Sequence, residues 1–115
     1  VACPEETPAA MASALATARE KIGFDELVVH TPDFAAASNA TEGEAHAMQE
    51  HQKTVVRLAG AGDSFNGGFL CASLGNLPLK ERLVMANAAT AFFVTHATGP
   101  TREELIAQIE KASDR

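Results

Sequence analysis

The sequence has few aromatic residues and few cysteines. Among its 115 residues there is no Trp and no Tyr, aromatic residues make up 5%, and there are two cysteines, Cys3 and Cys71. Two cysteines so far apart suggest neither a disulfide framework nor a zinc site, which fits a reducing compartment such as the cytoplasm. Hydrophobic residues make up 46% of the chain. We therefore expect a core of Ala, Leu, Val and Phe, with Cys71 inside it because free cysteine is usually buried.

The chain also lacks a basic surface and long apolar runs. Its formal net charge at pH 7 is −6, and nucleic acids and anionic membranes attract basic proteins, so we expect neither as a partner. No run of residues is long and apolar enough to span a membrane, and no signal sequence is visible. A negative protein repels a nucleotide, so a phosphate site would have to be formed locally by backbone N–H groups, helix ends or a metal ion.

The four histidines do not form a metal-binding pattern. His46 and His51 stand near Glu44 and Glu50, but their spacing and the turn expected there fix no coordination geometry, so we interpret them as solvent-exposed residues. His30 is interpreted as a hydrogen-bonded residue of a strand. No metal ligands are therefore predicted.

The first half of the chain predicts a helix followed by short strands. Thr7 and Pro8 are typical of a helix start, and Gly23 is typical of its end. Residues 27–30 form a short apolar run, as expected of a buried strand after a crossover helix. Residues 33–58 suggest two or three short antiparallel strands, although alanine-rich strands are weakly indicated.

A glycine-rich segment, residues 58–69, follows the β-branched residues 54–56, which predict another strand. After it, apolar spacing predicts a helix that ends at Gly75 in a left-handed conformation. Gly60 and Gly62 can adopt backbone angles closed to other residues. Consecutive N–H groups there can converge on a phosphate at the positive end of the helix.

Asp63 follows this glycine pair directly. A carboxylate at a phosphate site is unusual for pure binding, but it suits a proton acceptor beside a transferring phosphoryl group. The alternative interpretation is that Asp63 only caps a helix after a tight turn. Gly67 and Gly68 lie inside the same predicted helix at a cost of about 1 kcal/mol each relative to Ala. That cost indicates the close approach of another backbone or of a ligand.

Two further helices are predicted toward the C-terminus. Pro78 begins one that extends to about Thr95 and shares an apolar face. The other starts at residues 101–104, which have capping-box spacing, and is expected to bury three apolar residues, namely Leu105, Ile106 and Ile109. The alternation of elements is that of an α/β layer protein.

Residues 60–69, Gly-Ala-Gly-Asp-Ser-Phe-Asn-Gly-Gly-Phe, resemble the C-terminal signature of the ribokinase-like family of carbohydrate and nucleoside kinases, the PfkB family. Residues 85–91 look like the alanine-rich helix on the nucleotide side of that family, and residues 94–99 look like the loop after it. Upstream, residues 26–31 resemble the strand that leads to the nucleotide loop. The resemblance covers residues 20–112 in family order.

This resemblance implies part of a ribokinase-like three-layer αβα fold with a mostly parallel sheet. A kinase of this family is expected to be more than twice as long, and the chain begins at Val1 without an initiator Met. We therefore expect residues 1–115 to be the C-terminal nucleotide-binding and catalytic portion, without the N-terminal half and its lid. Such a portion alone should be inactive.

The resemblance also implies roles for individual residues. Asp63 would be the catalytic base, and the turn at Gly60, Ala61, Gly62 and Asp63 would be the anion hole. Nucleotide-binding positions would be Thr31, Asn87 and Gly99. ATP and Mg²⁺ are the implied cofactors, with K⁺ as an optional monovalent cation near Gly99. A sugar or nucleoside would be the substrate, and a homodimer is one implied assembly.

The sequence departs from the family pattern at two places. Arg57, Leu58 and Ala59 precede the signature where the family has Asp-Thr-Thr or a similar run, although Arg57 could contact a phosphate. Pro32 and Ala35 occupy positions where the family has a Gly-x-x-Gly turn. Two alternatives remain open. One is a related vitamin kinase of the hydroxymethylpyrimidine or pyridoxal type, and the other, motivated by the altered residues 57–59 and the missing half, is a noncatalytic nucleotide-sensing or interaction domain.

Overall fold

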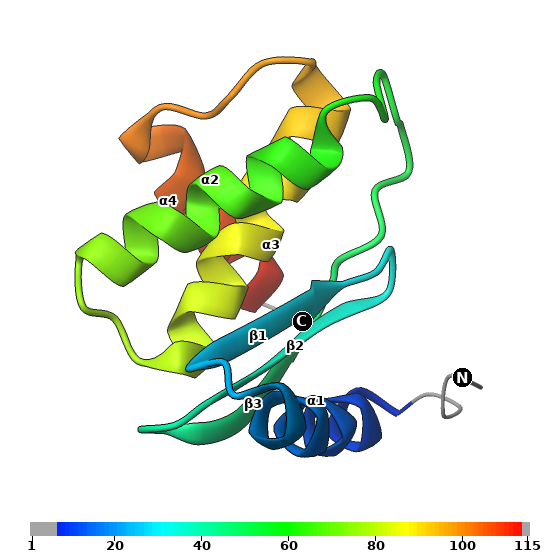
Figure 1. Cartoon of the computed structure of the whole chain (residues 1–115). Coiled ribbons are helices and arrows are strands. Elements are labelled where there is room, and N and C mark those ends of the chain that lie inside the picture. Colours follow the sequence, from blue (N-terminus) through cyan, green and yellow to red (C-terminus); the bar gives the residue numbers. More distant parts are fainter. Residues whose placement is uncertain (1–6, 114–115) are drawn as a thin grey trace.

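The computed structural model describes residues 7–113, which form one sheet and four helices (Figure 1). In chain order the elements are α1 (Pro8–Ile22), β1 (Glu26–His30), β2 (Phe34–Asn39), β3 (Gly43–Met48), α2 (Ala61–Leu74), α3 (Leu79–His96) and α4 (Arg102–Ser113). None of the described helices is long and apolar enough to cross a membrane.

The three described strands pair in the order β1-β2-β3, and both pairings are antiparallel. Val28 lies opposite Ala37, and Ala37 in turn lies opposite Ala45. The mostly parallel sheet that the resemblance implied is therefore not found among these strands. The physical reason is that residues 31–33 and 40–42 are the only links between consecutive strands. Links this short join antiparallel neighbours, because a parallel pair needs a crossover of a dozen or more residues.

Helices cover both faces of this sheet. In Figure 1, α1 lies on one side of the strands, and α3 lies on the other with α2 and α4 packed against it. The chain is thus an α/β protein with the expected helix, sheet and helix layers.

Strand β2 is buried along its whole length, because its two faces meet different helices. Ala35 and Ala37 pack in a cluster with Phe65 of α2 and Leu83 of α3. On the opposite face, Ala36 packs with residues of α1. Alanine is a poor strand former, but its small side chain lets helices approach both faces closely. Burial therefore outweighs intrinsic propensity here.

Most of the predicted helix ends are confirmed. The Thr7 hydroxyl accepts a hydrogen bond from the Ala10 N–H at 3.1 Å, and Gly23 ends α1 with a φ of 86°. At α4, the Thr101 N–H donates to the Glu104 carboxylate and the Glu104 N–H donates to the Thr101 hydroxyl, which is a complete capping box.

The predicted left-handed end at Gly75 is wrong by one residue. Gly75 has a φ of −82°, and the left-handed residue is Asn76, with a φ of 58°. Asparagine tolerates this conformation better than most residues, which is why the turn can leave the helix one position later.

The predicted strand at residues 54–56 is also wrong. Residues 49–60 connect β3 to α2 without regular structure. The N–H groups of Val56 and Arg57 donate to the Val94 carbonyl near the end of α3, at 2.7 and 3.2 Å. This backbone therefore pairs with a helix end and not with a strand, and the β-branched side chains of Val55 and Val56 are exposed.

Two apolar positions that we expected in the core are exposed. Helix α2 buries Phe65, Phe69 and Ala72, so the opposite side of the helix, which carries Cys71, faces outward. Ile106 of α4 is also exposed, while Leu105 and Ile109 are half-buried. Helical spacing predicted that these residues share a face, but it did not show how far the neighbouring helix would cover that face.

A polar cluster joins the β2–β3 turn to the start of α3. The Glu42 carboxylate accepts a hydrogen bond from the Leu79 N–H at 2.7 Å and one from the Asn39 side chain at 3.3 Å, and it lies 3.5 Å from the Arg82 guanidinium. The Leu79 N–H, the Asn39 amide and Arg82 together hold the pKa of Glu42 below its ordinary value of 4.5, against an opposing effect of burial. Glu42 therefore caps a helix that begins 37 residues later.

The lowered pKa of Glu42 predicts a pH-dependent contribution to stability. Because folding favours the carboxylate, this contribution is fully present above the unfolded pKa and is lost as the pH falls through the folded pKa. We expect Glu42→Gln to lower the free energy of unfolding near neutral pH, with a difference from wild type that shrinks below about pH 4.5. Urea unfolding over a pH series measures this, and a difference that stays constant with pH would contradict it.

The two glycines inside α2 predict opposite effects of the same substitution. A Cβ atom at Gly68 would lie 3.0 Å from Ala86 Cα and 3.1 Å from Ala89 Cβ, whereas one at Gly67 would meet nothing within 4 Å. Gly68→Ala should therefore force α2 and α3 apart and destabilise the protein by about 1–3 kcal/mol. Gly67→Ala, its matched control, should stabilise it by about 0.5–1 kcal/mol. Thermal unfolding of both variants tests the pair, and equal shifts would refute the close approach.

Candidate functional site

The start of α2 is shaped by a glycine that no other residue would replace easily. Gly60 precedes the helix with a φ of 97°, and a Cβ atom there would lie 3.0 Å from the Phe93 ring of α3. The Ala61 N–H donates to the Leu58 carbonyl at 3.0 Å, and the Ser64 N–H donates to the Gly60 carbonyl at the same distance. The turn is therefore closed by its own backbone and braced against α3.

Gly62 and Asp63, the second and third residues of α2, have backbone N–H groups that are free to bind a ligand. Among the described residues, the N–H groups of Gly62 and Asp63 have no hydrogen-bond acceptor. Asp63 is exposed in the first turn of α2, and its carboxylate likewise has no partner in the described part of the chain. The cap position itself belongs to Gly60, three residues earlier. The helix start thus offers free donors, the positive end of the helix dipole and one unengaged carboxylate.

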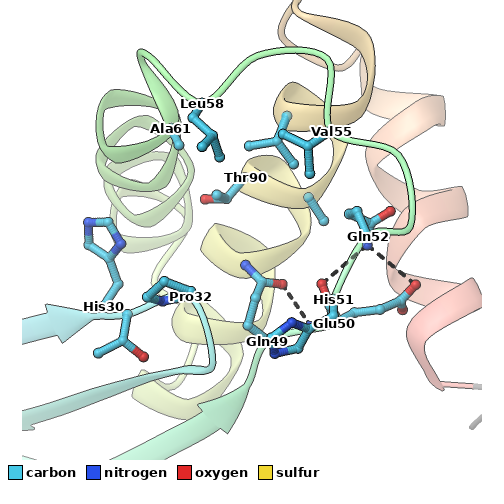
Figure 2. A pocket seen from close by; sticks show the side chains of 13 residues that line it. His30, Pro32, Gln49, Glu50, His51, Gln52, Val55, Leu58, Ala61 and Thr90 are labelled. Atoms are coloured by element: carbon cyan, nitrogen blue, oxygen red, sulfur yellow. Dashed lines mark hydrogen bonds between the residues drawn. The ribbon is translucent and has the colours of Figure 1, made fainter.

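A pocket of about 290 Å³ opens beside this helix start (Figure 2). Its lining comes from four segments that are distant in sequence: the end of β1 with the following turn, the connection 49–58, the first residue of α2 and the last turns of α3. Thr90 lies at the middle of the view in Figure 2, with Val55 and Leu58 above it and Pro32 below it. The pocket combines apolar walls with a few polar groups, as small-molecule sites commonly do.

The connection 49–58 is held in place by contacts that the sequence did not reveal. Besides the two N–H groups bound to Val94, the Thr95 hydroxyl donates to the Gln52 side chain at 3.3 Å. The His51 Nε2 atom lies 2.8 Å from the Asp33 carboxylate, and the two side chains are 71% and 66% exposed, so this contact adds little stability. In the sequence, only the run of four polar residues at 49–52 indicated that this connection could form a pocket wall.

The structure brings two of the predicted site positions together at this pocket. Thr31 and Ala61 both line it. The Thr31 hydroxyl also shapes the turn, because it accepts hydrogen bonds from the N–H groups of Asp33 and Phe34 at 3.1 and 3.0 Å. Its side chain therefore serves the fold as well as the pocket wall.

Asn87 and Gly99 lie elsewhere. Asn87 is buried, with 5% of its surface exposed, and its side-chain amide donates to the carbonyls of Ala47 and Met48 at 3.3 and 3.4 Å. Its buried Oδ1 atom has no partner among the described residues. Asn87 lines a smaller hollow next to α4 and not the pocket beside α2. Gly99 is exposed in the connection between α3 and α4, and it lines neither hollow.

His30 differs from what we expected of it. It is exposed at the end of β1, and no hydrogen bond to its ring is found among the described residues. Its ring instead stacks on Phe65 of α2, with centroids 4.4 Å apart, and it lines the pocket. The sequence did hold one sign that His30 could belong to the site, because His30 directly precedes the predicted site residue Thr31. We had interpreted His30 as an ordinary strand residue.

No cluster of three or more His, Cys, Asp or Glu side chains in residues 7–113 has a geometry that could hold a metal ion.

Comparison with known proteins places these features in one family. Residues 2–104 match the profile of the pfkB family of carbohydrate kinases. In a match of 55 residues that covers 45% of the chain, the sequence is 44% identical to the uncharacterized sugar kinase YegV of Escherichia coli strain K12. That stretch corresponds to 17% of the length of YegV.

Solved structures show the same fold. The nucleoside kinase of Methanocaldococcus jannaschii, an archaeal member of the ribokinase family, matches 76% of the chain with a TM-score of 0.68 and 22% identity. A candidate ribokinase II of E. coli in its apo form matches 94% of the chain with a TM-score of 0.69 and 24% identity. The chain spans 31% and 34% of these two proteins. On the profile match and this shared fold, the chain belongs to the pfkB family of carbohydrate kinases.

Proposed function

We propose that residues 1–115 form the C-terminal nucleotide-binding and catalytic portion of a kinase that transfers the γ-phosphoryl group of ATP to a hydroxyl group of a sugar or nucleoside. The observation that carries this proposal is the start of α2, where the free N–H groups of Gly62 and Asp63 and the Asp63 carboxylate share one helix turn. Of this turn, Ala61 lines the neighbouring pocket, and Gly62 and Asp63 lie outside its lining. The names of the relatives, a sugar kinase and a nucleoside kinase, support the substrate class.

In this proposal the anion hole is the turn at residues 60–63. Gly60 and Ala61 shape the turn, because their backbone groups bond to Ser64 and Leu58. Gly62 and Asp63 then present N–H groups to the phosphate, and the helix dipole adds to their attraction. Phosphoryl transfer depends mainly on positioning and on stabilising charge on the transferred group, which is what fixed backbone donors supply.

Asp63 is proposed as the catalytic base. As the substrate hydroxyl oxygen forms its bond to the γ-phosphorus, the bond from that phosphorus to the bridging oxygen breaks and ADP leaves. The hydroxyl proton passes to the Asp63 carboxylate, which is exposed and unengaged in the described structure. A strongly raised pKa is not required, because the hydroxyl becomes far more acidic late in the transfer.

The remaining predicted residues have lesser roles. Thr31 would contribute to the wall beside the nucleotide, and Asn87 could reach it only through Oδ1, since its amide nitrogen is bound to β3. Gly99 would lie in a loop near a monovalent cation such as K⁺. When bound, Mg²⁺ would supply charge neutralisation on the triphosphate.

The decisive variant is Asp63→Asn in the complete protein that contains this chain. We expect turnover to fall by about 10²–10⁴-fold, because the amide cannot accept the hydroxyl proton. Nucleotide affinity should be retained, since the free N–H groups remain. Steady-state kinetics and calorimetric titration with ATP measure the two quantities. The matched control is Glu103→Gln, which removes an exposed acid from the first turn of α4 and should leave turnover unchanged.

Other outcomes separate the alternatives. Unchanged turnover in Asp63→Asn would reject Asp63 as the base. A wild-type protein that binds ATP but phosphorylates no alcohol would favour a nucleotide-sensing domain. Preferential turnover of a hydroxymethylpyrimidine or pyridoxal would favour a vitamin kinase.

A further inference from the structure

The pocket beside α2 has few groups that can balance a negative ligand. None of its lining residues in the described chain is Lys or Arg, and the chain carries a net charge of −6. Asp63 adds a carboxylate in the first turn of α2, beside this pocket. The lining side chains that can carry a positive charge are two histidines, His30 and His51.

Only one of these histidines is available to a ligand. The His51 ring already faces the Asp33 carboxylate at 2.8 Å. The His30 ring has no hydrogen-bond or ion-pair partner among the described residues, and it is held by stacking on Phe65 at an interplanar angle of 14°. Stacking fixes the plane of the imidazole and leaves its ring N–H free to donate.

The free edge of the His30 ring faces the open end of α2. A Cβ atom built on Gly62 would lie 3.8 Å from His30 Nε2 and 3.8 Å from its Cε1. The ring edge therefore lies beside a residue whose own N–H is free. Figure 2 shows the His30 ring standing beside α2 at the border of the pocket.

We propose that His30 is a phosphate-binding residue of this site. Its Nε2–H donates a hydrogen bond to a phosphate oxygen of a polyphosphate held by the N–H groups of Gly62 and Asp63, at the border of a pocket that no Lys or Arg of the described residues lines. The ligand class is a nucleoside triphosphate or another polyphosphate, and not an uncharged nucleoside. This assignment rests on the proposed function, because it uses the same helix turn.

The test uses His30→Phe and His30→Lys in the complete protein, with inorganic tripolyphosphate as the probe. Phenylalanine keeps the stacking on Phe65 and removes the donor, so we expect tripolyphosphate to bind about 10-fold more weakly or worse, as for loss of a hydrogen bond to a charged group. Lysine restores a positive donor and should bind within about threefold of wild type. Calorimetric titration gives the affinities, and thermal unfolding confirms that each variant is folded.

His96→Phe is the matched control. The His96 ring also stacks on a phenylalanine, Phe92, at 3.9 Å, but it lies at the end of α3 and does not line the pocket. Its replacement should leave the affinity for tripolyphosphate unchanged. Equal affinity of wild type and His30→Phe would overturn the proposal, as would equal losses in the two phenylalanine variants or a wild-type protein that does not bind tripolyphosphate.

The two proposals fail separately. If the protein phosphorylates an alcohol in an Asp63-dependent way while His30→Phe leaves the tripolyphosphate affinity unchanged, the role of His30 is rejected and the kinase function stands. If tripolyphosphate binds in a His30-dependent way and no acceptor is phosphorylated, the phosphate site stands and the kinase function is rejected.

Discussion

The close packing of α2 against α3 is the constraint on which the site depends. At Gly68 the two helices are so near that a single added methyl group would collide with the backbone of Ala86. On the side facing the sheet, Phe65 and Phe69 join Ala35 and Ala37 in one cluster. These contacts fix the axis of α2. Its start is therefore held at the end of β1, where His30 and Thr31 border the pocket.

The same packing explains why the pocket sits at one end of the molecule. Gly60 passes against the Phe93 ring, and the Val94 carbonyl holds the connection before α2. A few residues in the last turns of α3 thereby position both the turn before α2 and the opposite wall of the pocket. The arrangement couples a rigid helix start to an irregular segment, which is a common way to place functional groups on a stable scaffold.

Local patterns in the sequence predicted local structure well, and they failed where a distant segment decides the outcome. The Thr101 and Glu104 capping box and the Thr7 cap depend on residues three positions apart, so the sequence was sufficient for them. The region at residues 54–56 has strand-forming side chains, but its N–H groups find the end of α3. For His30, neither the missing hydrogen-bond partner nor the contact with α2 is visible before the fold is known. The glycine signature identified the helix start, yet it could not show that the Ala61 N–H closes the turn.

The link between Glu42 and the Leu79 N–H has a consequence for the order of folding. A side-chain cap usually comes from a neighbouring residue and can form together with its helix, but here donor and acceptor are 37 residues apart. The first turn of α3 gains its cap only after the β2–β3 hairpin has closed and the chain has returned to it. The loop must close before this hydrogen bond can stabilise the helix. The hairpin and the helix start therefore form one cooperative unit, and the amide protons of both should exchange with solvent through a common opening event.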